Sequence, residues 1–164
     1  MSKTVQHLKE AFAGESQANR KYLAFAEQAE KDGFAAVAKL FRAAALAETV
    51  HAHAHLRVLG GVRETATNLH EALEGETHEF EKMYPRMIAD ADLEGNRDAA
   101  RSFRFANEVE QVHARLYREA LEQLGNNPDV TYSVCKVCGN TVAGEPPDVC
   151  PICGAKKIAF MKVD

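Results

Sequence analysis

The chain has 164 residues, of which 46% are hydrophobic and 27% charged, and its formal net charge is −4. This composition excludes a disordered chain, and the acidic balance argues against nucleic acid as the main partner, because phosphate binding needs a basic face. No apolar run approaches the roughly 18 residues of a membrane-spanning helix, and residues 1–7 lack the apolar region of a secretion signal. We therefore expect a cytoplasmic protein that binds neither nucleic acid nor membrane.

Helical periodicity and glycine-containing breaks predict a mainly α fold, a four-helix bundle, over most of the chain. The predicted helices span about residues 3–31, 34–59, 65–93 and 97–124. Asp32-Gly33, Gly60-Gly61 and Glu94-Gly95-Asn96 separate them. Pro85 lies inside the third helix, where its ring and its missing N–H predict a kink.

Two Glu-x-x-His motifs, Glu48 to His51 and Glu110 to His113, lie 62 positions apart in the second and fourth predicted helices. Positions i and i+3 share a helix face, so each motif aims one carboxylate and one imidazole at the same point. Glu15 and Glu76 lie on the other two helices. Together the six residues match the ligand set of di-iron or di-manganese bundles. The competing interpretation, surface residues that form salt bridges, is disfavoured by the matched spacing.

The helical region is internally repeated. The residues that recur 62 positions later are Gly33, Phe41, Arg42, Ala44, Glu48, Val50, His51 and Ala52. Gly14-Glu15-Ser16 recurs 61 positions later as Gly75-Glu76-Thr77. The repeat predicts a pseudo-twofold bundle in which each helix pair supplies one isolated Glu and one Glu-x-x-His motif.

Three further residues are candidates for the chemistry at this site. Glu79 lies three residues after Glu76 and so shares its helix face, whereas the residue at its place in the first repeat is Ala18. As an additional carboxylate beside the site, Glu79 could exchange with a metal ligand. An ordinary exposed glutamate on a helix would fit the same spacing. Tyr22 and Tyr84 could orient ligand carboxylates by hydrogen bonds, and ordinary core tyrosines fit the pattern equally well.

The last part of the chain carries all four cysteines, Cys135, Cys138, Cys150 and Cys153. The turn-forming composition of residues 125–132 predicts a linker. We therefore expect a helical domain over 1–126 and a small domain over 127–164. Two Cys-x-x-Cys pairs predict a four-thiolate metal site, whose bound ion would stabilise a segment too short to form its own core. Spacing does not separate iron from zinc, and a structural zinc ribbon stays open.

The chain resembles rubrerythrin over essentially its whole length. The resemblance rests on residues 13–22, both Glu-x-x-His motifs, Gly75-Glu76-x-x-Glu79 with Met83-Tyr84-Pro85, and the cysteine tail. It implies a ferritin-like bundle with a non-haem di-iron centre, followed by a rubredoxin-like domain of short β-strands and loops with one Fe(Cys)4 site. It also implies an oxidoreductase of the NADH peroxidase kind that reduces hydrogen peroxide to water in oxidative stress defence.

The same resemblance implies a role for each ligand. Glu15 and Glu76 would be terminal ligands, Glu48 and Glu110 would bridge, and His113 would bind one iron. The second iron would alternate between Glu79 when oxidised and His51 when reduced. Residues expected to take part in the reaction are therefore Glu79, His51, Tyr22 and Tyr84, with no cofactor besides the metals.

The resemblance also implies partners. A homodimer is expected, with or without exchanged helices, and the rubredoxin-like iron of one subunit would lie near the di-iron site of the other. Electrons would come from a rubredoxin-type donor or a reductase, such as a flavoprotein that uses NADH. Two other functions stay open: an iron-handling ferroxidase, and a helical interaction module with a zinc ribbon. Manganese or zinc would suit the same ligands as iron.

Overall fold

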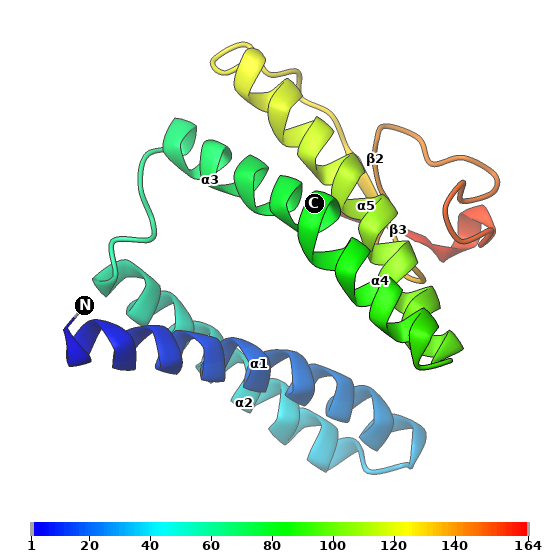
Figure 1. Cartoon of the computed structure of the whole chain (residues 1–164). Helices are drawn as coiled ribbons and strands as arrows, with labels where there is room; N and C mark the ends of the chain where they lie inside the picture. Colours follow the sequence, from blue (N-terminus) through cyan, green and yellow to red (C-terminus); the bar gives the residue numbers. More distant parts are fainter. Residues whose placement is uncertain (1, 164) are drawn as a thin grey trace. The chain divides into compact units, whose positions relative to one another are not determined.

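The computed structural model describes residues 2–163. Its helices are α1 (Lys3–Lys31), α2 (Ala35–Val58), α3 (Thr65–His78), α4 (Tyr84–Leu93) and α5 (Arg97–Glu122), and a π-helical segment, Glu79–Met83, joins α3 to α4. The strands β1 (Tyr132–Cys135), β2 (Thr141–Ala143) and β3 (Phe160–Val163) follow, with a 3₁₀ turn, Lys157–Ala159, before β3 (Figure 1). The predicted fold class is confirmed: a helical region precedes a small region of short strands.

The chain divides into two compact units, Met1–Arg63 and Glu64–Asp164. The first unit holds α1 and α2, and the second holds the other helices and the strands. This division differs from the predicted domains 1–126 and 127–164, which stay a prediction. Among residues 2–163, no helix combines the length and the apolarity that crossing a bilayer requires.

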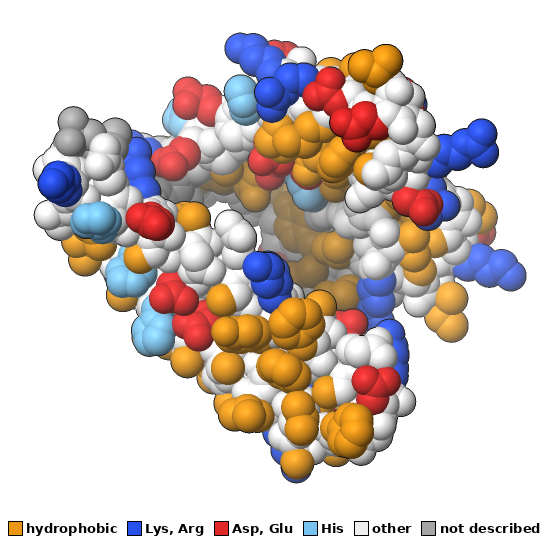
Figure 2. All heavy atoms as spheres, turned by 60° about the horizontal axis from the view of Figure 1, so that its bottom comes forward, with side chains coloured by type: hydrophobic (Ala, Val, Ile, Leu, Met, Phe, Trp, Pro, Cys, Tyr) orange, Lys and Arg blue, Asp and Glu red, His pale blue; other side chains and the backbone are white. Residues whose placement is uncertain are grey.

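The first unit is a helical hairpin with a core of small side chains. Ala26, Ala29 and Ala38 are buried where α1 packs on α2, and Phe41 packs against them. Between the helices Gly33 has φ +83°, a left-handed conformation that glycine adopts without the steric cost of a Cβ. Figure 2 shows hydrophobic side chains gathered over this hairpin. The large apolar residues of α2 that stay exposed are Val37, Leu40, Leu46, Val50 and Val58.

The second unit repeats the contacts of the first. Tyr84 packs on Phe103 with ring centroids 6.3 Å apart, as Tyr22 packs on Phe41 at 6.1 Å. The Arg104 side chain bonds Asp92 at 2.6 Å, and Arg42 bonds Glu30 at the same distance. The buried alanines also correspond, since Ala29, Ala38 and Ala52 have buried counterparts in Ala91, Ala100 and Ala114. The sequence repeat is therefore a repeat of packing within each hairpin, whereas the pseudo-twofold bundle stays a prediction.

The C-terminal segment of the second unit is a small antiparallel sheet with strand order β2-β1-β3. In its register Val134 pairs with Thr141, and Cys135 pairs with Phe160. The tight turn after each Cys-x-x-Cys pair returns a glycine N–H to the first cysteine, from Gly139 to Cys135 O at 2.8 Å and from Gly154 to Cys150 O at 2.9 Å. The sheet contacts α5 through β2.

Candidate metal centre

The first unit brings together three of the predicted ligands. Glu15 projects from α1, and Glu48 and His51 project from one face of α2, because i and i+3 coincide on a helix. One ligand atom of each residue lies within 4.8 Å of the others. His51 Nδ1 is 2.9 Å from Glu48 Oε2, and the His51 side chain is 55% exposed. This triplet is an open group of candidate metal ligands.

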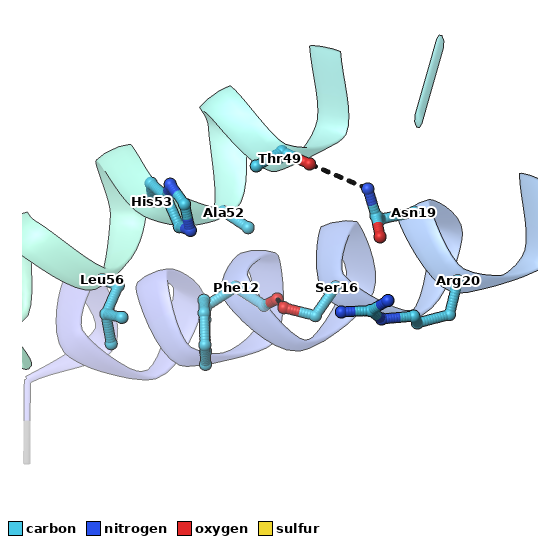
Figure 3. Close-up of a pocket in the computed structure, with 8 residues that line it drawn as sticks. All are labelled: Phe12, Ser16, Asn19, Arg20, Thr49, Ala52, His53 and Leu56. Atoms are coloured by element: carbon cyan, nitrogen blue, oxygen red, sulfur yellow. Dashed lines mark hydrogen bonds between the residues drawn. The ribbon is translucent and has the colours of Figure 1, made fainter. Parts of the chain in front are cut away.

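Two hydrogen bonds hold α1 against α2 beside this triplet. Asn19, one turn after Glu15, donates from Nδ2 to Thr49 Oγ1 at 2.8 Å and to Ala45 O at 2.7 Å. Figure 3 shows the hydrogen bond from Asn19, on α1, to Thr49, on α2. Both residues line a hollow of about 250 Å³ between the two helices. The lining residues are Phe12, Ser16, Asn19, Arg20, Thr49, Ala52, His53 and Leu56. None of these is a predicted ligand, so the hollow is distinct from the metal site.

The second unit brings together the corresponding triplet, Glu76 from α3 and Glu110 and His113 from α5. His113 Nδ1 lies 2.8 Å from Glu110 Oε2 and 3.8 Å from Glu76 Oε1. The His113 side chain is 27% exposed, about half the exposure of His51 in the first triplet. Each triplet lies wholly within one unit, and this second one is the more enclosed.

Two carboxyl groups of the second triplet are held in contact against their mutual repulsion. Burial, followed by the hydrogen bond and the charge of Glu110, raises the pKa of Glu76 from 4.5 to about 7. Burial is also the main reason why the pKa of Glu110 is raised. A bound divalent cation would replace the shared proton and remove the repulsion. The electrostatics of the triplet therefore fit a metal ion.

The π-helical segment explains a one-residue shift in the internal repeat. The offset between the repeats is 61 residues at Glu15 and Glu76 but 62 residues at Tyr22 and Tyr84. A π turn inserts one extra residue into an α-helix, and π turns are frequent at functional sites. The inserted turn lies between Glu76 and Tyr84 and begins at Glu79. The structure thus interrupts the third predicted helix at the π segment Glu79–Met83, whereas the kink at Pro85 stays a prediction.

Glu79 lies near the second triplet, but its carboxylate is not one of the clustered ligand atoms. It is half-buried, and its charge acts on Glu76, Glu110 and Tyr84. Its carboxylate is not among the ligand atoms that cluster within 4.8 Å. Glu79 is placed to act on the site electrostatically, and binding a metal would require its side chain to move.

The two predicted tyrosines differ in their surroundings. Burial, then the charges of Glu79, Glu110 and Glu76, raise the pKa of the Tyr84 phenol. Tyr84 therefore faces the carboxylates of the second triplet. Tyr22 packs against the rings of Phe25 and Phe41. Both tyrosines pack on a phenylalanine ring, and Tyr84 in addition lies near the second triplet.

Two residues that were not predicted from the sequence, Tyr117 and Thr141, also lie at the second triplet. Tyr117 follows His113 by four residues, and its pKa is raised by burial and then by Glu76 and Glu110. Helical i+4 spacing would have been enough to find it. Thr141 Oγ1 lies 2.9 Å from His113 Nε2. No local pattern predicts that contact, because 28 positions separate the two residues.

The four cysteines form a cluster with the dimensions of a tetrahedral site. The Sγ atoms of Cys135 and Cys153 are 3.7 Å apart, and those of Cys138 and Cys150 are 3.6 Å apart. Sulfurs about 2.3 Å from a tetrahedral ion would be roughly 3.8 Å from one another. Burial acts to raise the pKa of Cys150, but N–H groups of Cys153 and Ile152 outweigh it, and the pKa falls to about 7. Burial raises the pKa of Cys138 and of Cys153, so it is the spacing of the four sulfurs that fits a thiolate-bound metal.

Comparison with known proteins agrees with this arrangement of sites. Residues 6–121 match the family model described as rubrerythrin, and residues 134–161 match the model of the rubredoxin-like domain of rubrerythrin. The chain belongs to the rubrerythrin family. Within this family the four-cysteine cluster and the two Glu/His triplets fit iron sites.

Individual rubrerythrin relatives match over nearly the whole chain. Rubrerythrin-2 of Clostridium acetobutylicum is 34% identical over 174 residues, which cover 96% of this chain and 95% of the relative. Nigerythrin of Nitratidesulfovibrio vulgaris is also 34% identical and is covered to 85%. A structure of nigerythrin in a mixed-valence state matches with a TM-score of 0.60 and 33% identity, over 99% of this chain and 88% of that one. A fully reduced, all-ferrous nigerythrin gives a TM-score of 0.61 at 32% identity.

Proposed function

We propose that this member of the rubrerythrin family is a peroxidase that reduces hydrogen peroxide to water. The observation that carries the proposal is that β2, which follows the Cys138 turn, packs against the helix that holds Glu110 and His113. A four-thiolate iron passes single electrons, whereas cleavage of one O–O bond to two waters needs two electrons and two protons. A pair of ferrous ions supplies those two electrons when it is bound. A one-electron site beside a two-metal site suits this requirement.

We assign the ligands by their place in the two triplets. Glu15 and Glu76 would each hold one metal ion, and Glu48 and Glu110 would bridge the pair. His113 would bind one ion through Nδ1, the ring nitrogen that faces Glu110 and Glu76. His51 and Glu79 would alternate on the other ion. The exposure of His51 and the position of Glu79 outside the clustered ligand atoms leave both side chains room to move.

Two phenols would assist the reaction as hydrogen-bond donors. Burial and the neighbouring carboxylates raise the pKa of Tyr84 and of Tyr117, so both hydroxyls keep their protons at neutral pH. A neutral phenol donates a hydrogen bond to a carboxylate or to a peroxide oxygen. Tyr84 and Tyr117 would thereby hold the ligand carboxylates and hydrogen peroxide in place.

The proposed activity needs an electron donor that reaches the four-cysteine site. We propose a rubredoxin-type protein or a reductase in that role, and a homodimer as the working assembly. A reducing compartment such as the cytoplasm would keep the four thiols available for iron.

A stopped-flow comparison of the two oxidants tests the proposal. The iron-loaded protein is reduced anaerobically and mixed with hydrogen peroxide or with oxygen, while the visible bands are followed. We expect much faster oxidation by peroxide, with two electrons leaving the helical iron pair per peroxide. Faster oxidation by oxygen would instead favour an iron-handling ferroxidase. A colourless protein that holds only zinc after expression with ample iron would favour the interaction module.

A further inference from the structure

The segment after Cys138 contacts α5 at His113 and passes close to Val109, one turn earlier. A Cβ added at Gly139 would lie 3.7 Å from Val109 Cγ1, an ordinary van der Waals contact. Thr141, at the start of β2, places its hydroxyl 2.9 Å from His113 Nε2. Val109 and His113 are at i and i+4, so they lie on the same side of α5. The turn that carries a predicted thiolate ligand is thus seated directly on the helix that carries a Glu-x-x-His motif.

The ring of His113 presents its two nitrogens to different neighbours. Nδ1 lies 2.8 Å from Glu110 Oε2 and 3.8 Å from Glu76 Oε1, and Nε2 lies 2.9 Å from Thr141 Oγ1. A metal ion bound at Nδ1 would leave the ring proton on Nε2, and that N–H would donate to Thr141 Oγ1. The Thr141 hydroxyl would then direct its own hydrogen to Gly139 O, which lies 3.1 Å away. The ring is thus placed as a metal ligand requires, with its second nitrogen held by an outer partner.

The contact lies at the edge of an apolar hollow of about 370 Å³. Its lining residues are Leu69, His113, Leu116, Tyr117, Ala120, Tyr132, Val134, Thr141 and Val163. Apolar walls limit competition from water, which makes a hydrogen bond stronger and its loss more costly. In the first unit the counterpart His51 is more exposed and bonds Glu48. The second triplet thus differs from the first in that its histidine contacts the four-cysteine segment, through Thr141.

We infer that Thr141 is a positioning residue that couples the two metal sites of one chain. A metal in the four-cysteine cluster orders the turn of Cys138 and Gly139, and that turn holds the Thr141 hydroxyl against His113. Metal at the four thiolates therefore strengthens metal binding at Glu76, Glu110 and His113, and linkage requires the reverse effect to be equal. The inference rests on the ligand assignments of the proposed function, but not on the oxidant. The resemblance implied that the two kinds of site approach each other between subunits, whereas this link lies within one chain.

Thr141→Val tests the link, since valine keeps the shape of threonine and suits a strand but lacks the hydroxyl. The full chain is loaded with zinc at the four cysteines and titrated anaerobically with cobalt(II) against a competing chelator. We expect Thr141→Val to weaken cobalt binding at the helical site by about tenfold or more, as loss of an outer hydrogen bond to a metal-bound His does. Thr141→Ser keeps the hydroxyl and should bind cobalt nearly as the unmodified chain does. Thr131→Val, the same change at an exposed position of the same segment, is the matched control.

A spectroscopic signal separates positioning from general loss of structure. The Nε2 proton of a cobalt-bound His113 should give a shifted, slowly exchanging proton NMR signal in the unmodified chain and in Thr141→Ser. In Thr141→Val that proton should exchange much faster. Unchanged cobalt affinity and unchanged proton exchange in this variant would overturn the inference.

A measurement on the unmodified chain decides the question even if the valine variant does not fold. Cobalt at the helical site should slow the loss of zinc from the cysteines to a chelator, because the coupling is reciprocal. Equal rates of zinc loss with and without cobalt would overturn the inference. Coupling in a protein that prefers oxygen to peroxide would refute the proposed peroxidase and leave this link standing. Faster oxidation by peroxide together with equal rates of zinc loss would support the proposed peroxidase and overturn this inference.

Discussion

The carboxyl groups of Glu76, on α3, and Glu110, on α5, belong to one cluster whose ligand atoms lie within 4.8 Å of one another, although both groups carry a charge when ionised. One of the two carboxyl groups must hold a proton for this contact to exist without a metal. The contact therefore makes the stability of the metal-free protein depend on pH.

The sign of that dependence follows from the raised pKa of Glu76. Burial and then Glu110 raise this pKa from 4.5 to about 7, so between these pH values the folded protein holds a proton that the unfolded chain has released. The free energy of unfolding therefore falls as the pH rises from about 4.5 to about 7. We expect the Tm of the metal-free protein to fall over this range, measured by circular dichroism in buffers of equal ionic strength.

Glu76→Gln should remove most of this pH dependence, because the glutamine side chain cannot ionise. Glu74→Gln, on an exposed position of the same helix, should keep it. Binding of iron should reverse the trend, because metal ions compete with protons for the carboxylates. A metal-free protein whose Tm rises steadily from pH 4.5 to 7 would contradict the prediction.

Loss of one thiolate should separate single turnover from steady turnover. In Cys135→Ser the tail loses one of the two buried thiols of its four-cysteine cluster, while both Glu/His triplets stay intact. We expect pre-reduced protein to complete one turnover with peroxide, and steady turnover to fall severely because electrons no longer reach the helical pair. Stopped-flow and steady-state assays of the same preparation measure both. Full steady activity would exclude the four-cysteine site as the electron relay.

The surplus carboxylate of the π-helical segment should matter more for turnover than for folding. Glu79→Gln removes the charge that acts on Glu76, Glu110 and Tyr84. We expect turnover with peroxide to fall by roughly 10–100-fold, the usual effect of changing a group that supports a metal site. Glu81→Gln, an exposed change within the same segment, is the control. Equal kinetics for the two variants would place Glu79 outside the reaction.

The link between α1 and α2 should contribute measurably to stability. Asn19→Ala removes two hydrogen bonds between the helices, to Thr49 Oγ1 and to Ala45 O, while Thr49 Oγ1 still donates to Ala45 O. We expect a loss of about 1–3 kcal/mol in the free energy of unfolding, measured by urea denaturation. Gln17→Ala changes an exposed residue of the same helix and should cost under about 0.5 kcal/mol. A matching loss in both variants would show that the Asn19 bonds do not stabilise the hairpin.

The sequence was sufficient for the features that depend on local periodicity. Glu48 and His51 share a helix face because the backbone turns by a fixed angle per residue, and the same holds for Glu110 and His113. The second helix, predicted over about 34–59, spans Ala35–Val58, because glycines mark its ends. The third, predicted as one helix over 65–93, is divided by the π-helical segment. The shift of the repeat from 61 to 62 residues signalled an insertion but not its position within the helix.

Only the tertiary structure decided which residues surround each triplet. Tyr84 and Tyr22 occupy equivalent places in the repeat and each packs on a phenylalanine ring, yet Tyr84 also lies near carboxylates that raise the pKa of its phenol. Thr141 reaches His113 from a strand beyond the helices, and its hydroxyl orients the ring. Helical spacing is set by the backbone of one segment and can be read from it. Contacts such as Thr141 with His113 depend on how two distant segments pack, and no single stretch of sequence encodes that.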